Sequence, residues 1–380
     1  MATRKPSRSA SPSPTKPRST SEATSPLHLT MRDNVVTSDN DNLSSGMSDL
    51  VPEKFKDKAQ FLDIVQWNIE WFGATRSAEK DRNRFDLVVG ILEALNSDLF
   101  VFQEIAGPSS DGRYEGVLDA VARELRERGA GDYVSYYASA GGEQRVAMMW
   151  DRDWIRAKDE VRDLFPRGHH RAPNGKDAFA GRTPLFGYFA ARIPEPHPAR
   201  EGEYLGGPGV FPFQALGVHL KAMPDGHVQR LASSRVLANW LSLEAAQAGV
   251  DSLILGDWNA PPDDPCWKPF HDMEDGQQET VKFRQINDPS DFSYLWLQNQ
   301  SSKFVSRIDL AAVSLASESK PEEALLGQAI RWKPIEEAIA RAGSMTDRRV
   351  REVLTEIKET ISDHLPVISR FYLASPGEEL

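Results

Sequence analysis

The sequence predicts a layered α/β domain. Two stretches of the chain follow the same order of strand, helix and strand, and each strand is a short apolar run that ends in a polar side chain. Short apolar runs indicate buried strands, whereas apolar residues spaced three and four apart indicate a helix that covers a sheet. We expect these elements in chain order: strand 61–68, helix 85–95, strand 99–102, strand 213–219, helix 231–243 and strand 252–255.

Other elements are predicted in the same way. The first helix is indicated by Phe85, Val88, Val89, Leu92 and Leu95, whose helical spacing places one apolar stripe against a core. A length of 380 residues fits two domains of about 150 residues, or one large α/β core with a tail. Four further strands are expected at 144–150, 184–192, 305–313 and 367–372.

The composition is that of a folded protein. Hydrophobic residues make up 40% of the chain, and nine Trp and seventeen Phe are ample for a sizeable core, which excludes a wholly disordered chain. Cys266 is the single cysteine, so the chain has no internal disulfide and no zinc site built from several cysteines. Any metal ion must therefore be bound by oxygen atoms or by histidine.

The first 50 residues are expected to form a disordered tail ahead of a folded domain at 55–375. The tail is rich in Ser, Thr and Pro, and its first 21 residues carry five basic side chains and no acid. Such a segment cannot bury enough apolar surface to offset its ordering entropy. An organellar transit peptide is also rich in Arg and Ser, but this segment lacks the hydrophobic half of an amphipathic helix.

Charge and hydropathy limit the partners and the compartment. The first 50 residues hold six Lys and Arg against five Asp and Glu, which leaves 39 basic and 51 acidic side chains, a net of −12, in the other 330. Contacts to phosphate must then come from local patches. The chain shows neither an apolar run of about 18 residues nor a secretory signal. We expect a soluble, intracellular monomer, cytoplasmic or, in a eukaryote, nuclear.

Polar side chains stand where the predicted strands end. They are Asn68, Glu104, His219, Asp257 and Asn259. In open α/β sheets, ligands bind at the carboxyl ends of the strands. A turn explains any one Asp or Asn after a strand, but turn chemistry explains the whole set poorly.

The C-terminal part adds Asp309 and the pair Asp363-His364. An Asp-His pair alone is more often a helix cap or a loop, but here it accompanies six other polar residues. The carboxylates and amides form a set of hard oxygen ligands without clustered cysteine, which favours Mg²⁺ or Mn²⁺ over zinc. His219 and His364 add two groups that can hold or donate protons near neutrality.

Six short motifs, in this order, resemble those of the endonuclease/exonuclease/phosphatase superfamily. They are Trp67-Asn68-Ile69-Glu70-Trp71-Phe72-Gly73, Phe102-Gln103-Glu104, Gly217-Val218-His219, Gly256-Asp257-Trp258-Asn259, Arg307-Ile308-Asp309 and Ser362-Asp363-His364. The superfamily includes deoxyribonuclease-I-like nucleases, apurinic endonucleases, sphingomyelinases and inositol-polyphosphate phosphatases. The resemblance implies a catalytic domain folded as a four-layer α-β-β-α sandwich of two packed mixed β-sheets flanked by helices, with the site at one end of the sheets.

The resemblance also implies roles for the metal ligands and for the residues around the attacking water. Glu104 would be the main ligand of Mg²⁺ or Mn²⁺, and Asn68 and Asp363 would help directly or through water. Asp257 looks like the residue that orients or deprotonates the attacking water. Asn259 looks like the one that fixes the phosphate.

The histidines and an arginine complete the implied site. Asp309 resembles the acid that orients His364, and Glu143 lies where deoxyribonucleases place a carboxylate partner for the second histidine, here His219. Arg182 matches their phosphate-contacting arginine. Glu143 could equally be a solvated hairpin residue, and Arg182 could cap a loop. With such carboxylate partners, both histidines would be cationic and would offset the charge of a phosphodiester.

Differences between this sequence and the motifs of related enzyme classes narrow the choice of substrate. Arg307-Ile308-Asp309 and Asn259-Ala260-Pro261-Pro262 replace motifs of the inositol-polyphosphate phosphatases, and Gly141 stands where deoxyribonucleases place an aromatic residue. The basic residues Arg167, Arg171 and Lys176 lie just before Arg182 in sequence and form either a surface that binds substrate phosphates or a solvated loop.

We therefore expect a Mg²⁺-dependent phosphodiesterase, with a nuclease acting on nucleic acid as the favoured form. The alternatives are a sphingomyelinase-like enzyme, a hydrolase of small phosphate esters, or an inactive binding module on the same fold. The last is disfavoured because Glu104, Asp257, Asn259, His219 and His364 are all present.

Overall fold

The computed structural model describes ten stretches of the chain. They are residues 61–109, 115–192, 210–243, 245–271, 282–289, 291–295, 305–315, 328–331, 333–344 and 346–372. All of them fall within one compact unit. The expected tail, residues 1–50, lies outside the described residues.

One six-stranded sheet contains the N- and C-terminal strands of the described chain. Its order is β14 (Gln328–Ala329), β15 (Val367–Tyr372), β1 (Phe61–Phe72), β2 (Leu99–Ile105), β4 (Arg145–Asp151) and β3 (Tyr133–Tyr137). Strands β1 and β2 are parallel and the remaining pairs are antiparallel, so the sheet is mixed. This sheet carries Asn68 and Glu104.

A second, seven-stranded sheet is also mixed. Its order is β10 (Lys282–Gln285), β13 (Asp309–Leu315), β9 (Asp251–Asp257), β8 (Val210–His219), β7 (Leu185–Arg192) and β5 (Ile155–Ala157), and β6 (Arg162–Asp163) pairs with β7. The parallel pair is β8 and β9, in which His219 lies opposite Asp257. A small separate ladder joins β11 (Tyr294–Leu295) to β12 (Val305–Ser306).

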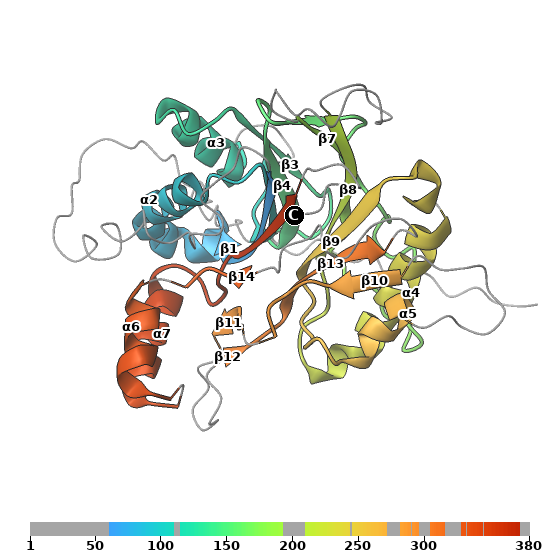
Figure 1. Cartoon of the computed structure of the whole chain (residues 1–380). Coiled ribbons are helices and arrows are strands. Elements are labelled where there is room, and N and C mark those ends of the chain that lie inside the picture. The colour runs from blue at the N-terminus through green and yellow to red at the C-terminus, as the bar shows by residue number, and fades with distance from the viewer. Residues whose placement is uncertain are drawn as a thin grey trace, which may run out of the picture. The chain divides into compact units, whose positions relative to one another are not determined.

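Helices cover the outer faces of the two sheets (Figure 1). The first sheet packs against α2 (Ala78–Leu95), α3 (Val117–Glu127), α6 (Lys333–Ala342) and α7 (Arg348–Thr360), and the second against α4 (His227–Leu243) and α5 (Lys268–His271). A third apolar cluster fills the space between the sheets. These layers confirm the predicted α-β-β-α sandwich. Short 3₁₀ turns are η3 (Thr75–Ser77), η4 (Pro224–Gly226), η5 (Ala245–Ala248) and η6 (Pro265–Trp267).

The six principal elements predicted from the sequence are present, and one of the additional strands is not as expected. Residues 305–313 form two strands in different sheets, because Val305 and Ser306 pair with β11 whereas β13 begins at Asp309 and pairs with β9. The break lets Asp309 start its strand at the same edge as Asp257, which is its Cα partner.

The strand ends meet at one edge because of the two parallel pairs. Asn68 lies opposite Gln103 in the first sheet, and His219 lies opposite Asp257 in the second. Gly256 allows β8 and β9 to approach closely at this edge: its φ is 147°, and a Cβ there would lie 2.0 Å from the Val218 carbonyl oxygen. Among the described residues, no helix is long and apolar enough to cross a membrane.

Candidate active site

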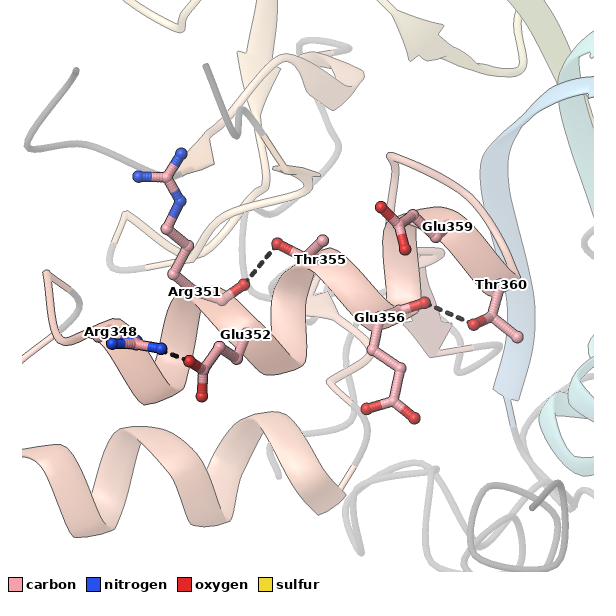
Figure 2. A pocket seen from close by; sticks show the side chains of 7 residues that line it. All are labelled: Arg348, Arg351, Glu352, Thr355, Glu356, Glu359 and Thr360. Atoms are coloured by element: carbon pink, nitrogen blue, oxygen red, sulfur yellow. Dashed lines mark hydrogen bonds and ion pairs between the residues drawn. The ribbon is translucent and has the colours of Figure 1, made fainter. Parts of the chain in front are cut away.

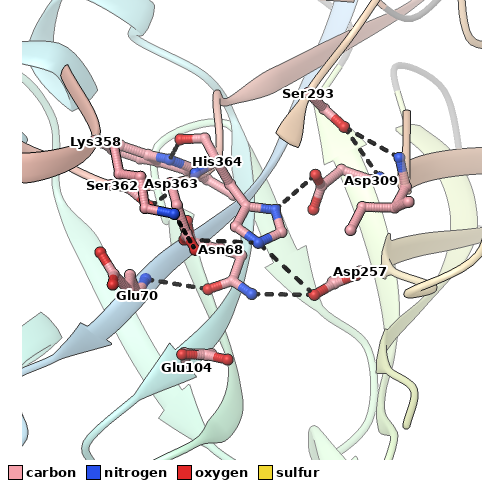
Figure 3. Close-up of polar contacts among 12 residues, drawn as sticks. Asn68, Glu70, Glu104, Asp257, Ser293, Asp309, Lys358, Ser362, Asp363 and His364 are labelled. Atoms are coloured by element: carbon pink, nitrogen blue, oxygen red, sulfur yellow. Dashed lines mark hydrogen bonds and ion pairs between the residues drawn. The ribbon is translucent and has the colours of Figure 1, made fainter. Parts of the chain in front are cut away.

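Most of the predicted site residues lie together at this edge and come from both sheets. Figure 3 shows Asn68, Glu104, Asp257, Asp309, Asp363 and His364. Asn68 and Glu104 come from β1 and β2, His219 and Asp257 end β8 and β9, and Asp309 begins β13. Asp363 and His364 lie just before β15 and complete the group. Segments that are almost 300 residues apart in sequence are joined directly, since Ser362 Oγ donates to the Asn68 carbonyl at 2.8 Å.

His364 is held by a buried carboxylate. Its Nδ1 lies 2.7 Å from Asp309 Oδ2, and both side chains are almost inaccessible to solvent. Burial alone lowers the pKa of His364, but the charges of Asp309 and Asp363 outweigh it and raise the pKa to about 10. His364 is therefore an imidazolium at neutral pH. The ring of Tyr294 lies against it, with 4.7 Å between centroids.

Asp257 is the most hydrogen-bonded acid of the site. Its Oδ2 accepts from Asn68 Nδ2 and from Asn259 Nδ2, each at 3.1 Å, and its Oδ1 accepts from the Asn259 backbone N–H at 2.8 Å. Burial raises the pKa of Asp257 above its ordinary value, and the nearby charge of His364 opposes this shift. His364 Nε2 lies 4.0 Å from Asp257 Oδ2. The carboxylate is thus fixed in orientation and able to accept a proton near neutrality.

Two site residues have left-handed backbone conformations that ordinary residues rarely adopt. Glu104 has φ of 60° and Asn259 has φ of 49°. At Glu104 the pairing of β2 shifts register, so its side chain leaves the regular alternation of the strand. Strained backbone of this kind is concentrated at functional sites, and here it coincides with a predicted metal ligand, Glu104, and a predicted catalytic residue, Asn259.

Glu104 lies among charges of both signs. Its Oε1 accepts from Gln144 Nε2 at 2.9 Å. Burial raises the pKa of Glu104, the charge of His364 lowers it, and the charge of Asp363 raises it again. Two carboxylates that repel each other in a buried site favour a bound cation, because the cation offsets both charges.

The side chains near Glu104 and Asp363 fit a divalent metal ion better than a neighbouring cluster does. Asp257, Asp309 and His364 place ligand atoms within 4.8 Å of one another. However, His364 Nδ1 already contacts Asp309 at 2.7 Å, so this ring nitrogen is engaged without an ion. Glu104, Asp363 and the Asn68 amide instead supply the oxygen atoms that Mg²⁺ and Mn²⁺ prefer. The Asn68 amide oxygen accepts from the Glu70 backbone N–H at 3.0 Å, so Asn68 is fixed before any ion binds.

His219 has a different environment from the one predicted. Arg182 Nη1 lies 3.1 Å from His219 Nδ1 and also contacts Nε2, and Arg182 Nη2 donates to the Leu220 carbonyl at 3.0 Å. A guanidinium only donates, so the histidine must accept and be neutral. Burial and then the charge of Arg182 lower the pKa of His219 well below its ordinary value. The prediction that both histidines are cationic is wrong for His219.

The predicted pairing of Glu143 with His219 is also wrong in the described part of the chain. Glu143 Oε1 accepts from the Thr75 backbone N–H at 2.9 Å. The carboxylates near His219 are instead Asp257 at 3.5 Å and Glu104 at 3.7 Å. The physical reason is that the buried guanidinium of Arg182 occupies the position next to the imidazole. Arg182 was predicted to contact phosphate, and the structure brings it into the site.

The three basic residues before Arg182 lie on an ordered hairpin. Arg171 forms an isolated bridge with Asp177 and donates from Nη1 to the Gly175 carbonyl at 2.9 Å. Arg167 and Lys176 are exposed. The hairpin therefore presents cations at the surface. This agrees both with a surface that binds substrate phosphates and with a solvated loop.

Several residues that shape the site were not predicted. Gln144 donates a hydrogen bond to Glu104, whereas the prediction named the preceding residue, Glu143. Ser293 Oγ accepts from the Asp309 backbone N–H at 3.1 Å. The Ser293 carbonyl also accepts from the Leu365 backbone N–H at 2.7 Å, next to His364. No sequence pattern identifies Ser293, because it lies in a short segment without periodicity.

The four-layer sandwich carries buried acids, amides and an imidazolium at one end of its sheets. The chain belongs to the Endonuclease/Exonuclease/phosphatase family, whose model matches residues 65–364. This membership indicates a hydrolase of phosphate esters. Members of this family generally depend on a divalent metal ion. None of the curated proteins is similar enough to match the chain.

Solved structures share the fold at low sequence identity. An endonuclease/exonuclease/phosphatase from Bacteroides vulgatus is 12% identical with a TM-score of 0.52, and the alignment covers 83% of this chain and 99% of that one. A family protein from Bacteroides thetaiotaomicron is 15% identical with a TM-score of 0.50, covering 84% and 100%. D. rerio TDP2, solved with a single strand DNA product, is 14% identical with a TM-score of 0.45, covering 83% and 99%. The two Bacteroides structures support the fold.

Proposed function

We propose that the chain is a Mg²⁺- or Mn²⁺-dependent phosphodiesterase that hydrolyses the phosphodiester bonds of nucleic acid. One observation supports this most strongly. A buried imidazolium, His364, and a buried carboxylate with a raised pKa, Asp257, face each other across 4.0 Å at the end of the paired sheets. A positive group and a proton acceptor at this spacing suit attack by water on a charged ester.

Glu104, Asn68 and Asp363 would hold the metal ion. When bound, the ion would neutralise charge on the phosphate oxygens and on the leaving group. All three residues offer oxygen atoms, and Glu104 and Asp363 are close enough to raise the pKa of Glu104 by repulsion. Asn68 also donates to Asp257, so the proposed ligand set and the proton acceptor are joined by one hydrogen bond of 3.1 Å.

The other residues would act on the water and on the phosphate. Asp257 would orient the attacking water and accept its proton, since three N–H donors fix the carboxylate. Asn259 would hold a phosphate oxygen. His364, oriented by Asp309, would place positive charge where negative charge grows in the transition state. Arg182 would add a second fixed cation, and His219 would position it as a neutral acceptor.

Nucleic acid is the proposed substrate because the chain has cations where a polyanion would approach. Residues 51–380 have a net charge of −12. Long-range attraction of nucleic acid to the protein is therefore poor, and local cations must compensate. The hairpin residues Arg167, Arg171 and Lys176 precede the buried Arg182 and supply such a patch.

The test is an assay of the full chain with a panel of substrates. Single- and double-stranded DNA, RNA, sphingomyelin and a small chromogenic phosphodiester are incubated with Mg²⁺ or Mn²⁺, with and without a chelator. Metal-dependent cleavage of nucleic acid that is abolished by His364→Ala supports the proposal. Hydrolysis of sphingomyelin or small esters alone, or full activity in excess chelator, would contradict it.

A further inference from the structure

A cation that the proposed mechanism does not use lies at the rim of the site. Lys358 belongs to the last turn of α7, and its Nζ lies 3.9 Å from Asp363 Oδ2 (Figure 3). The other oxygen of this carboxylate, Oδ1, lies 3.7 Å from His364 Nε2. Asp363 therefore stands between the lysine and the imidazolium, and two distances join Lys358 to the proposed catalytic atoms.

Lys358 is more accessible than the other cations of the site. Arg182 and His364 are buried, whereas the side chain of Lys358 is 32% exposed and that of Asp363 is 18% exposed. The lysine thus touches a proposed metal ligand on one side and solvent on the other. A substrate that approaches from solvent can reach it.

The turn that carries Lys358 is tied to β1 by two side chains of α2. Lys80 Nζ donates to the Lys358 carbonyl at 2.8 Å and lies 2.6 Å from Glu70 Oε2. Arg84 donates to the Glu70 carbonyl at 2.8 Å and to the Ile361 carbonyl at 2.6 Å. The C-terminal end of α7 is therefore fixed against the end of β1, the strand that supplies a proposed metal ligand.

The two lysines at this place differ in how firmly each is paired. Lys80 contacts Glu70 at 2.6 Å, and Glu70 is not a proposed metal ligand. Among the described residues, Asp363 is the only acid within 4.0 Å of the Lys358 ammonium. An ion bound by Asp363 offsets the charge of this carboxylate, so Lys358 loses its partner whereas Lys80 keeps Glu70. An ammonium without a partner attracts an anion.

The charges at the other end of α7 neutralise one another. Figure 2 shows a hollow beside this helix, and Arg348 Nε there lies 2.8 Å from Glu352 Oε1. The charged residues that line the hollow are Arg348, Arg351, Glu352, Glu356 and Glu359. Lys358 is not among the lining residues. Arg348 precedes it by ten residues, which span about 15 Å along a helix, so Arg348 carries the same charge away from the site.

We infer that Lys358 is a substrate-binding residue, whose ammonium leaves Asp363 for a phosphate oxygen of the substrate when Asp363 holds the metal ion. An ammonium suits this role because it is a compact charge with three donors. The inference rests on the proposed function. It adds a residue from α7 that none of the six sequence motifs contains.

Removal of the lysine charge should have opposite effects on the ion and on the phosphate. Lys358 competes with a dication for Asp363, so its loss should strengthen binding of the ion. The same loss removes a contact to phosphate and should weaken binding of the substrate. A lysine that only supported the fold would weaken both or leave both unchanged. The opposite signs therefore distinguish a substrate-binding residue from a structural one.

The experiment uses three variants of the full chain. Lys358→Met removes the charge and keeps an unbranched side chain, and Lys358→Arg keeps the charge. Arg348→Met removes one positive charge from the same helix as the matched control. Calorimetry measures binding of Mn²⁺ to the substrate-free protein, and then binding of inorganic phosphate to the protein saturated with Mg²⁺. Steady-state kinetics on a small chromogenic diester and urea midpoints accompany both.

Lys358→Met should bind Mn²⁺ about two- to fivefold more tightly, the range for a partly exposed ion pair. It should bind phosphate at least about tenfold more weakly, because a hydrogen bond between charged groups is lost. KM for the diester should rise by a similar factor with little change in kcat, since the contact is made in both the ground state and the transition state. Lys358→Arg should retain phosphate binding, and Arg348→Met should behave as the wild type.

The outcomes separate failure of the inference from failure of the proposed function. Unchanged phosphate binding and KM in Lys358→Met overturn the inference, and so does weaker binding of both Mn²⁺ and phosphate with a lowered urea midpoint. If the wild type cleaves no nucleic acid but Lys358→Met shows the two opposite effects, the nuclease proposal fails and the role of Lys358 stands. If the wild type binds no Mn²⁺, the proposed metal site and the inference both fail.

Discussion

His364 Nδ1 and Asp309 Oδ2 are 2.7 Å apart in a buried environment. This contact decides which ring nitrogen of His364 faces the site. With Nδ1 committed to Asp309, Nε2 lies 3.7 Å from Asp363 and 4.0 Å from Asp257. Asp309 is itself held by Ser293 through its backbone N–H. One acid thus fixes the orientation and the charge of the imidazole, and the opposite nitrogen faces Asp257 and Asp363.

Asp309→Asn should lower kcat on a small diester by about 10²-fold or more, because an amide neither sustains the imidazolium nor selects its orientation. The fold should be kept, since Asn has nearly the same shape and β13 still pairs with β9. Steady-state kinetics and the urea midpoint are the measurements. A near-wild-type kcat with unchanged stability would show that Asp309 has no part in catalysis.

Glu104→Gln should raise the Mg²⁺ concentration needed for half-maximal activity by at least about tenfold, because a hard dication prefers a carboxylate to an amide. The matched control is Glu143→Gln on the adjoining turn, whose carboxylate contacts the Thr75 backbone and not the site. Metal titrations of activity compare the two. Equal effects of the two substitutions would contradict both the ligand assignment and the reassignment of Glu143.

Much of the fold and of the site could be predicted because short local sequence patterns identify the strands. The apolar runs that end at Asn68 and His219 locate both parallel pairs, and the polar ends then mark the edge where they meet. The arrangement of the four layers depends instead on packing between elements distant in sequence, and the resemblance to a known family supplied it.

The remaining parts of the site depend on contacts that a sequence pattern does not reveal. Glu143 and Gln144 are adjacent on one turn, and only the turn geometry decides that Gln144 reaches Glu104. The approach of Arg182 to His219 joins residues 37 positions apart, and it reverses the expected charge of the histidine. The left-handed backbones of Glu104 and Asn259 arise where strands end. Asn is one of the few residues that favour this conformation, whereas no residue preference indicates it for Glu104.

Arg84→Met should destabilise the protein by about 3–5 kcal/mol, the usual cost of removing one partner of a buried ion pair. Arg84 is fully buried and donates to Asp81 Oδ1 at 2.7 Å, to the Ile361 carbonyl at 2.6 Å and to the Glu70 carbonyl at 2.8 Å. Its loss leaves two buried acceptors and one partly buried acceptor without their donor.

The matched control for this change is Arg82→Met on the same helix, because Arg82 is exposed and should cost no more than about 0.5 kcal/mol. Urea unfolding followed by circular dichroism measures both. Equal midpoints for the two variants would show that the Arg84 contacts contribute little to stability.

Cys266 should be inert towards a thiol reagent in the native protein and react fully after denaturation. The side chain is 1% exposed, next to Trp267, whose ring lies 3.9 Å from that of Trp258. Burial, followed by the charge of Asp264, raises the pKa of the Cys266 thiol. The nucleophile in such reactions is the thiolate, so both access and ionisation are suppressed.

The reagent is 5,5′-dithiobis(2-nitrobenzoate), which releases thionitrobenzoate when it reacts with a thiol. Because the chain has one cysteine, the amount released counts Cys266 alone. The rate of release reports how often this part of the core opens. We expect no rapid release from the native protein and one thiol per chain in guanidinium chloride. Metal ion should not alter the native rate, since Cys266 lies outside the proposed ligand set. Reaction of the native protein at the rate of a free thiol would show that η6, which contains Cys266, does not stay packed against α4 in solution.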